Sequence, residues 1–288
     1  MRLSMLLTML VLSAPGVRGV PAVVNGAMEG TPVDHSDGKG LLLTPPGWTP
    51  VNHNTARGDR LSVEPSDRPG AGQCLHVHTF GPDAGVYQTV APLTKGGTYL
   101  VTAWVKRLSG TLNIEAYPFH WGPAAMRRPD GRSNGWTQLA VGLTAVDEGA
   151  HLYLVATPEA DFLIDDVQIH PAPLQVGVPE LLPYDFGDLW RYRVTLAASA
   201  GAPASPTVSV QAVAAEDAAG DVLAPPQSVR LDGAGPWTAI VGLPLAAERS
   251  FCLEVRDPAS GAVLGGSSIT LPPGSPWIVR YPSKNALF

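Results

Sequence analysis

Aromatic and polar side chains recur at alternate positions in two neighbouring stretches of this sequence. Trp104 lies in the first stretch, and Asn113, Glu115 and Tyr117 share one face of the second if it is extended; Trp121 follows shortly afterwards. Aromatic rings stack on the apolar face of a sugar, and a few polar groups fix its orientation through hydrogen bonds. We expect the two stretches to be neighbouring strands of one sheet, and these five residues to line a cleft on its concave face that binds a polysaccharide or other glycan. The alternative is that the aromatic residues pack in a core or lie on the surface without a ligand.

His76 and His78 are a second candidate for chemistry, as metal ligands. Side chains at alternate positions of a strand point the same way about 6.6 Å apart, so both rings could bind one metal ion. An acidic residue, Asp83, follows them. The alternative is that the two histidines are hydrogen-bonded residues on a sheet surface.

Other catalytic motifs are not found in the sequence. There is no Gly-x-Ser-x-Gly nucleophile motif and no glycine-rich phosphate loop. A glycosidase needs two carboxylates on either side of the bond it cleaves, and nothing in the sequence brings such a pair together. We therefore expect a protein that is not an enzyme.

The charge distribution argues against nucleic acid as a partner. The net charge is -6, and the 19 lysines and arginines are scattered along the chain, whereas nucleic-acid binders present a basic patch or stripe. Charged residues make up only 15% of the sequence, below the roughly 25% of a typical globular domain. A neutral or weakly polar partner fits this composition better, and the composition does not define an oligomeric state.

The first 22 residues have the pattern of a secretory signal peptide. Arg2 supplies the positive charge, residues 6–12 form a short apolar run, and small residues follow up to Ala22. The run is too short to cross about 30 Å of hydrocarbon, which disfavours a membrane anchor, and no later segment is apolar enough to span a membrane. We expect cleavage after Ala22 and a secreted protein, either extracellular or periplasmic.

Short segments with a period of two dominate the rest of the first half of the chain. They are residues 73–80, 98–106, 111–117, 136–143, 151–157 and 161–170. Strands of this kind, separated by Gly, Pro and Asp, are typical of an antiparallel β-sandwich with one face of each sheet buried. The prediction for residues 23–171 is therefore an all-β domain.

A second domain is expected from residue 172 onward. The stretch from Pro171 to Pro173 suits the end of one sheet and the start of another, because proline removes a backbone donor. About seven further short strands follow, a pattern typical of an immunoglobulin-like β-sandwich over residues 172–288.

Six motifs in the first domain carry a family resemblance. They are VNGAMEG at 24–30, GW at 47–48, VYQTV at 86–90, GTYLVTAWVK at 97–106, GWTQL at 135–139 and FLIDDV at 162–167. In this order and spacing, residues 20–171 resemble the carbohydrate-binding modules of the CenC type. The resemblance implies a galactose-binding-like jelly roll of eight or nine strands.

The resemblance also implies a structural calcium ion that ties the first strand to the last. The acidic positions of the family fall here on Glu29, Asp165 and Asp166. Calcium prefers carboxylate and carbonyl oxygens, and two adjacent strand residues point to opposite faces, so only one of the two aspartates should reach the ion. The alternative is that these acidic residues cap turns.

Three functional hypotheses follow. The first is a secreted, non-catalytic carbohydrate-binding protein or accessory module, and the second is a structural or adhesion protein that binds another protein. The third is a metal enzyme similar to the cupins, because Gly70, His76 and His78 partly resemble the first cupin motif. A cupin would have glutamate in place of Asp83 and a second motif beginning Gly-Pro-Gly-His-Asn, and the sequence has neither.

Overall fold

The computed structural model describes residues 21–36, 41–51, 53, 57–81, 84–110, 112–118, 125–127, 135–177, 179–183, 189–198, 206–214, 222–233, 235–244 and 250–270. The named elements in these ranges are all β-strands, which confirms the predicted all-β class. No helix within them is long and apolar enough to span a lipid bilayer. Trp121, Asp83 and the first 20 residues of the predicted signal peptide lie outside the described residues.

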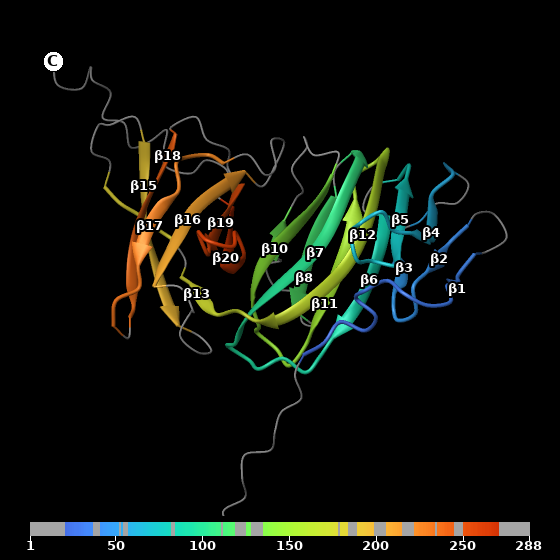
Figure 1. Ribbon diagram of the computed structural model, residues 1–288, viewed down its shortest axis with the longest axis horizontal. Coiled ribbons are helices and arrows are strands. Elements are labelled where there is room, and N and C mark those ends of the chain that lie inside the picture. The colour runs from blue at the N-terminus through green and yellow to red at the C-terminus, as the bar shows by residue number, and fades with distance from the viewer. Residues whose placement is uncertain are drawn as a thin grey trace, which may run out of the picture.

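The first half of the chain forms two five-stranded antiparallel sheets packed face to face (Figure 1). Sheet I has the order β10 (Trp136–Thr144), β7 (Thr98–Ser109), β12 (Ala160–Pro171), β5 (Gln73–Thr79) and β4 (Arg60–Pro65). Sheet II has the order β3 (Thr49–Val51), β6 (Ala84–Val90), β11 (Ala150–Ala156), β8 (Leu112–Pro118) and β9 (Ala125–Arg127). The short strands β1 (Val33–Asp34) and β2 (Leu43–Thr44) form a separate pair.

The period of two seen in the sequence places one side of each strand in the core. Val101, Ala103 and Val105 of β7 face Leu152 and Leu154 of β11 across the two sheets, and all five belong to one buried cluster. The residues between them point outward, so each sheet also has an outer face that can carry polar and aromatic side chains.

Strands β7 and β8 follow each other in sequence but lie in opposite sheets. The prediction that they are neighbours in one sheet is therefore wrong. Gly110, with φ of 70°, makes the turn between them, and a β-carbon on this residue would lie 2.4 Å from the Cα of Ala160. The tight glycine turn passes the chain from sheet I to sheet II, as in a jelly roll, where a hairpin would have kept it in one sheet.

A second β-sandwich follows, and its core begins at Leu174 where the first core ends at Ile169. Sheet III contains β13 (Leu174–Val176), β15 (Leu189–Ala198), β14 (Glu180–Leu181) and β18 (Trp237–Pro244). Sheet IV has the order β17 (Gln227–Arg230), β16 (Thr207–Ala214), β19 (Ser250–Arg256) and β20 (Val263–Thr270). The immunoglobulin-like topology of this sandwich stays a prediction.

The two sandwiches touch through strand β20, which lies against β10 and β7 on the outer face of sheet I (Figure 1). Leu100, Ala140 and Ala172 form a small buried cluster there, with Val263 of β20 packed against it. The backbones approach closely at Gly142, because a β-carbon on it would lie 1.9 Å from the carbonyl oxygen of Gly266. The second sandwich therefore covers one end of sheet I.

Candidate ligand-binding face

Three tyrosines gather on the outer face of sheet II. Tyr87 of β6 lies directly opposite Tyr153 of β11, and their rings stack with centroids 5.3 Å apart and planes 20° apart. Tyr117 of β8 meets Tyr153 edge to face, with centroids 5.7 Å apart. All three rings are only partly buried. Together they form an aromatic surface across three adjacent strands.

Polar side chains flank this surface. Glu115 of β8 lies directly opposite Tyr153, and Asn113 lies two residues along the same strand face. Both are nearly covered, at 8% and 7% exposed. His151 lies between Tyr117 and Thr89 in the register, and its Nδ1 is 3.2 Å from the Thr89 hydroxyl. We call Tyr87, Tyr117, Tyr153, His151, Asn113 and Glu115 the aromatic face.

The electrostatics of the face centre on Tyr153. Burial raises the pKa of its hydroxyl, and the neighbouring Tyr87 and Glu115 act in the same direction. The Tyr153 hydroxyl therefore stays protonated at neutral pH and can donate a hydrogen bond, while the Glu115 carboxylate can only accept. A face with both donors and acceptors beside aromatic rings can bind the hydroxyls and the apolar surface of a sugar.

The structure brings together three of the five predicted ligand-binding residues, namely Asn113, Glu115 and Tyr117. Trp104 does not join them, because it lies on the outer face of sheet I, where Arg68 covers it with the guanidinium carbon 5.5 Å from the ring centroid. Trp121 lies outside the described residues.

Sequence reasoning missed Tyr87, His151 and Tyr153. Their alternation with buried residues is visible in the sequence, at Val86-Tyr87-Gln88 and at His151-Leu152-Tyr153. That pattern shows only that each tyrosine points outward from its strand. The pairing of β6 and β8 on either side of β11 is what brings the rings together.

The acidic residues predicted to bind calcium are engaged in other contacts. Glu29 is exposed, and its Oε1 accepts hydrogen bonds from the backbone N–H groups of Gly72 and Gln73 at 3.1 and 2.9 Å. Asp165 is buried, and its Oδ2 accepts a hydrogen bond of 2.8 Å from Nε of Arg68. Burial raises the pKa of Asp165, while Arg68 opposes that shift.

Arg68 already supplies the positive charge that a calcium ion would bring to the aspartates. Asp166 Oδ2 also lies 3.9 Å from Arg68, because a bulge between Asp165 and Gln168 and a φ of 48° at Asp166 turn both carboxylates toward it. Adjacent aspartates were expected to diverge, and the bulge overrides that alternation. Glu29 thus contacts the backbone of Gly72 and Gln73 while the two aspartates contact Arg68, and the calcium site stays a prediction.

The histidine pair also has other partners. His76 lies between two carboxylates, with Nδ1 2.8 Å from Glu64 and Nε2 2.6 Å from Asp161, so both ring nitrogens are occupied. His78 Nδ1 lies 3.4 Å from Asp161. Over the ranges that the structure covers, no group of three or more His, Cys, Asp or Glu side chains could hold a metal ion. This arrangement does not support the cupin-like hypothesis.

Comparisons with known proteins found similarity to solved structures only, and several of these contain carbohydrate-binding modules. No protein-family model matches the chain, and no curated protein does. One similar solved structure contains the CBM22-1 and GH10 modules of Clostridium thermocellum endo-1,4-beta-D-xylanase 10B with xylohexaose, at 17% identity and a TM-score of 0.36, over 43% of this chain and 26% of that one.

Two others are carbohydrate-binding modules alone. A CBM4 structure matches at 17% identity and a TM-score of 0.37, over 52% of this chain and 99% of that one. The CBM22-1-CBM22-2 tandem domain of Paenibacillus barcinonensis Xyn10C matches at 12% identity and a TM-score of 0.38, over 91% of this chain and 94% of that one. All three structures contain carbohydrate-binding modules, the kind of protein that residues 20–171 resemble in their motifs. At these TM-scores the similarity by itself assigns no ligand to this chain.

Proposed function

We propose that this protein is a secreted, non-catalytic carbohydrate-binding protein whose ligand lies on the aromatic face. The observation that carries the proposal is the row formed by Tyr87, Tyr153 and Glu115 across three adjacent strands. Adjacent strands lie about 4.8 Å apart, so the row spans a length that suits successive sugar units of an extended glycan chain.

The chemistry of the row suits sugars. The tyrosine rings present flat apolar surfaces for the C–H face of a pyranose, and covering them excludes water. Glu115 accepts hydrogen bonds from hydroxyls, and a hydrogen bond to a charged acceptor is about twice as strong as one to a neutral group. Glu115 therefore matters more for orientation than Asn113.

The same face supports a binding role in preference to glycoside hydrolysis. Hydrolysis by the usual mechanism uses two carboxylates about 5 to 9.5 Å apart. Among the described outward residues of β6, β11 and β8, Glu115 is the one carboxylate. Binding without cleavage is the function that this set of side chains supports best.

The test is affinity electrophoresis of the chain from Val23 onward against soluble β-glucan, xylan and mannan. A ring of this size contributes about 1.5–3 kcal/mol when it is covered, so Tyr153→Ala should weaken retention by about tenfold or more. Ile240→Ala, a truncation of an exposed residue of β18, is the control and should bind as the wild type does.

The opposite result is equally clear. If none of the polysaccharides and no glycan on an array retards the wild-type protein, the carbohydrate-binding role fails. The structural or adhesion role, with another protein as the partner, then takes its place.

A further inference from the structure

The outer face of sheet I is covered at one end and open at the other. Strand β20 covers Leu100 and Ala140. The loop between β4 and β5 covers the middle, where Asp67 binds Trp136 Nε1 at 2.7 Å and also pairs with Lys106. The side chains of β4 and β5 beyond this loop remain open to a ligand.

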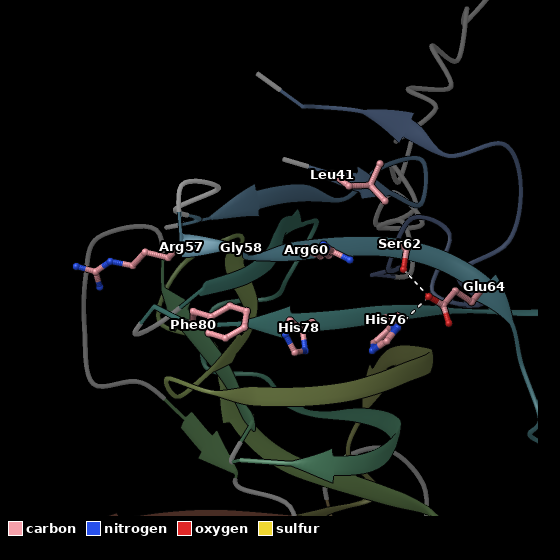
Figure 2. A pocket seen from close by; sticks show the side chains of 9 residues that line it. All are labelled: Leu41, Arg57, Gly58, Arg60, Ser62, Glu64, His76, His78 and Phe80. Carbon is pink, nitrogen blue, oxygen red and sulfur yellow. Dashed lines mark hydrogen bonds and ion pairs between the residues drawn. The ribbon is translucent and has the colours of Figure 1, made fainter. Parts of the chain in front are cut away.

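A pocket of about 620 Å³ lies at the open end (Figure 2). This volume falls in the range of small-molecule sites. His76 and His78 of β5 stand in a row with Phe80, which directly follows the strand, and Arg60 and Ser62 lie beside them on β4 (Figure 2). The residues that line it are Leu41, Arg57, Gly58, Arg60, Ser62, Glu64, His76, His78 and Phe80.

Two of the side chains that line the pocket are apolar and exposed. Phe80 is 42% exposed and Leu41 is 44% exposed, which is unusual for large apolar side chains. The Phe80 ring is held against His78, with centroids 4.8 Å apart, and the backbone N–H of Phe80 is bound by the buried carboxylate of Asp59. A fixed, exposed ring of this kind is a platform on which a sugar can stack.

Two arginines, Arg57 and Arg60, bring positive charge to the lining of the pocket. Arg60 lies directly opposite His78 in the register, and neither Arg60 nor Arg57 pairs with an acidic side chain anywhere in the described ranges. Arg57 points away from the row, which leaves Arg60 as the central cation (Figure 2). A guanidinium binds a carboxylate through two parallel hydrogen bonds.

His76 contacts two carboxylates, Glu64 in the pocket lining and Asp161 beside it. Glu64 on β4 and Asp161 on β12 both bind its ring, at 2.8 and 2.6 Å. Burial lowers the pKa of His76, but the hydrogen bonds that its ring donates to Glu64 and Asp161, together with their negative charges, outweigh that effect and raise the pKa overall. Each ring nitrogen of His76 lies within hydrogen-bond distance of a carboxylate oxygen, and a ring protonated at both nitrogens offsets one of the two negative charges that would otherwise repel an anionic ligand.

We propose that this pocket is a second saccharide site, separate from the aromatic face, that binds a sugar bearing a carboxylate group. The sugar ring stacks on Phe80, and its carboxylate pairs with Arg60. Ser62 lies within reach of its hydroxyls.

Binding of an acidic sugar at this site depends on pH. The groups that face His76 and His78 are Arg60 and Glu64 on β4, Asp161 on β12, and Lys106 on β7, which is itself paired with Asp67. When the pH rises through the pKa of His76, the ring loses its charge and leaves Glu64 and Asp161 uncompensated. Affinity for the acidic sugar then falls.

The test compares glucuronic acid with glucose, which differ in the carboxylate at C6, by ligand-observed NMR on the chain from Val23 onward. Glucuronic acid should bind and glucose should bind at least about tenfold more weakly, since one charge-assisted contact is lost. Arg60→Gln should abolish this preference, and Phe80→Ala should weaken glucuronic acid binding. Arg230→Gln on β17, which is 78% exposed, is the matched control and should have no effect.

Two outcomes would overturn the proposal: no binding of glucuronic acid, or binding that Arg60→Gln leaves unchanged. Tyr153→Ala separates this site from the aromatic face. Loss of glucuronic acid binding in Tyr153→Ala, with Arg60→Gln unaffected, would assign the acidic sugar to the aromatic face and leave the pocket without a ligand.

Discussion

Arg68 connects three side chains that sequence reasoning had assigned to two different functions. Its guanidinium lies over Trp104, which was expected in a sugar cleft, and binds Asp165 and Asp166, which were expected to bind calcium. Asp165 is 1% exposed, so its charge would be costly without a partner. At this position an arginine of the chain stabilises the buried carboxylate.

Arg68→Ala should therefore lower the free energy of unfolding, by about 3 kcal/mol, because removing one partner of a buried ion pair leaves the other uncompensated. Chemical denaturation followed by fluorescence measures this change. The double variant Arg68→Ala with Asp165→Asn should recover most of the loss, since the amide carries no charge.

Chelation is the control for this assignment. Addition of a chelator should leave the melting temperature of the wild type unchanged when Arg68 holds the aspartates. A lower melting temperature with chelator, together with calcium detected by elemental analysis, would restore the ion that the family resemblance implied.

At the scale of the elements, the sequence predicts strands well and their partners poorly. Expected strands at 98–106 and 161–170 correspond to β7 and β12, which extend a few residues further. Alternation also identified the outward face of β8 correctly, with Asn113, Glu115 and Tyr117 on it. Each of these predictions depends only on residues within one strand.

Predictions that depended on pairing between strands were less successful. Trp104 was grouped with Glu115 because β7 and β8 are consecutive, but the turn at Gly110 sends them to different sheets. Tyr87 and Tyr153 are 66 positions apart in sequence, so only the antiparallel register of β6 and β11 shows that they stack. Long-range pairing is set by the packing of the whole sandwich, which local patterns do not contain.

Strands β4, β5 and β12 are tied together on the outer face of sheet I by the Glu64–His76–Asp161 contacts. The pKa of His76 is raised in the folded protein above its ordinary value of 6.5. Such a group contributes stability that is fully present below its unfolded pKa and is lost as the pH rises through its folded pKa.

The wild type should accordingly lose stability relative to His76→Gln as the pH increases from about 6.5 upward. Melting temperatures measured from pH 5 to 9 test this. Only the difference between the two proteins is diagnostic, because burial lowers the pKa values of His53 and His170 and so gives them the opposite pH dependence. Parallel pH profiles for wild type and variant would show that the contacts of His76 with Glu64 and Asp161 do not stabilise the folded protein.

At the scale of the whole molecule, the contact between the sandwiches fixes how they are arranged. The buried cluster of Leu100, Ala140 and Ala172 with Val263 is small, but the backbone approach of Gly142 to Gly266 leaves no room for a side chain. The division of the chain into domains at residues 171 and 172 stays a prediction, and a fragment of residues 23–171 would expose Leu100 and Ala140 to water.

Gly142→Val should separate the two sandwiches without unfolding either one, because its β-carbon would meet the Gly266 carbonyl at 1.9 Å. Small-angle X-ray scattering should then show a larger radius of gyration, with the circular dichroism of the wild type retained. Gln138→Ala, an exposed change on the same strand, should leave the radius unchanged. An unchanged radius in Gly142→Val would mean that the contact tolerates a shift of β20.

The loop between β4 and β5 and strand β20 lie over the outer face of sheet I. They also limit which part of a polymer can enter the proposed pocket. A glycan that crosses β4 and β5 meets the loop of Asp67 and Arg68 before it can pass β12, and strand β20 lies beyond that loop. The pocket is thus closed on the side of β12, so a chain that enters it across β4 ends there, which suits chain ends and short branches. Short acidic chains carry more ends per gram than long ones. On such material the amount of protein bound would therefore follow the number of chain ends and not the length of the chains.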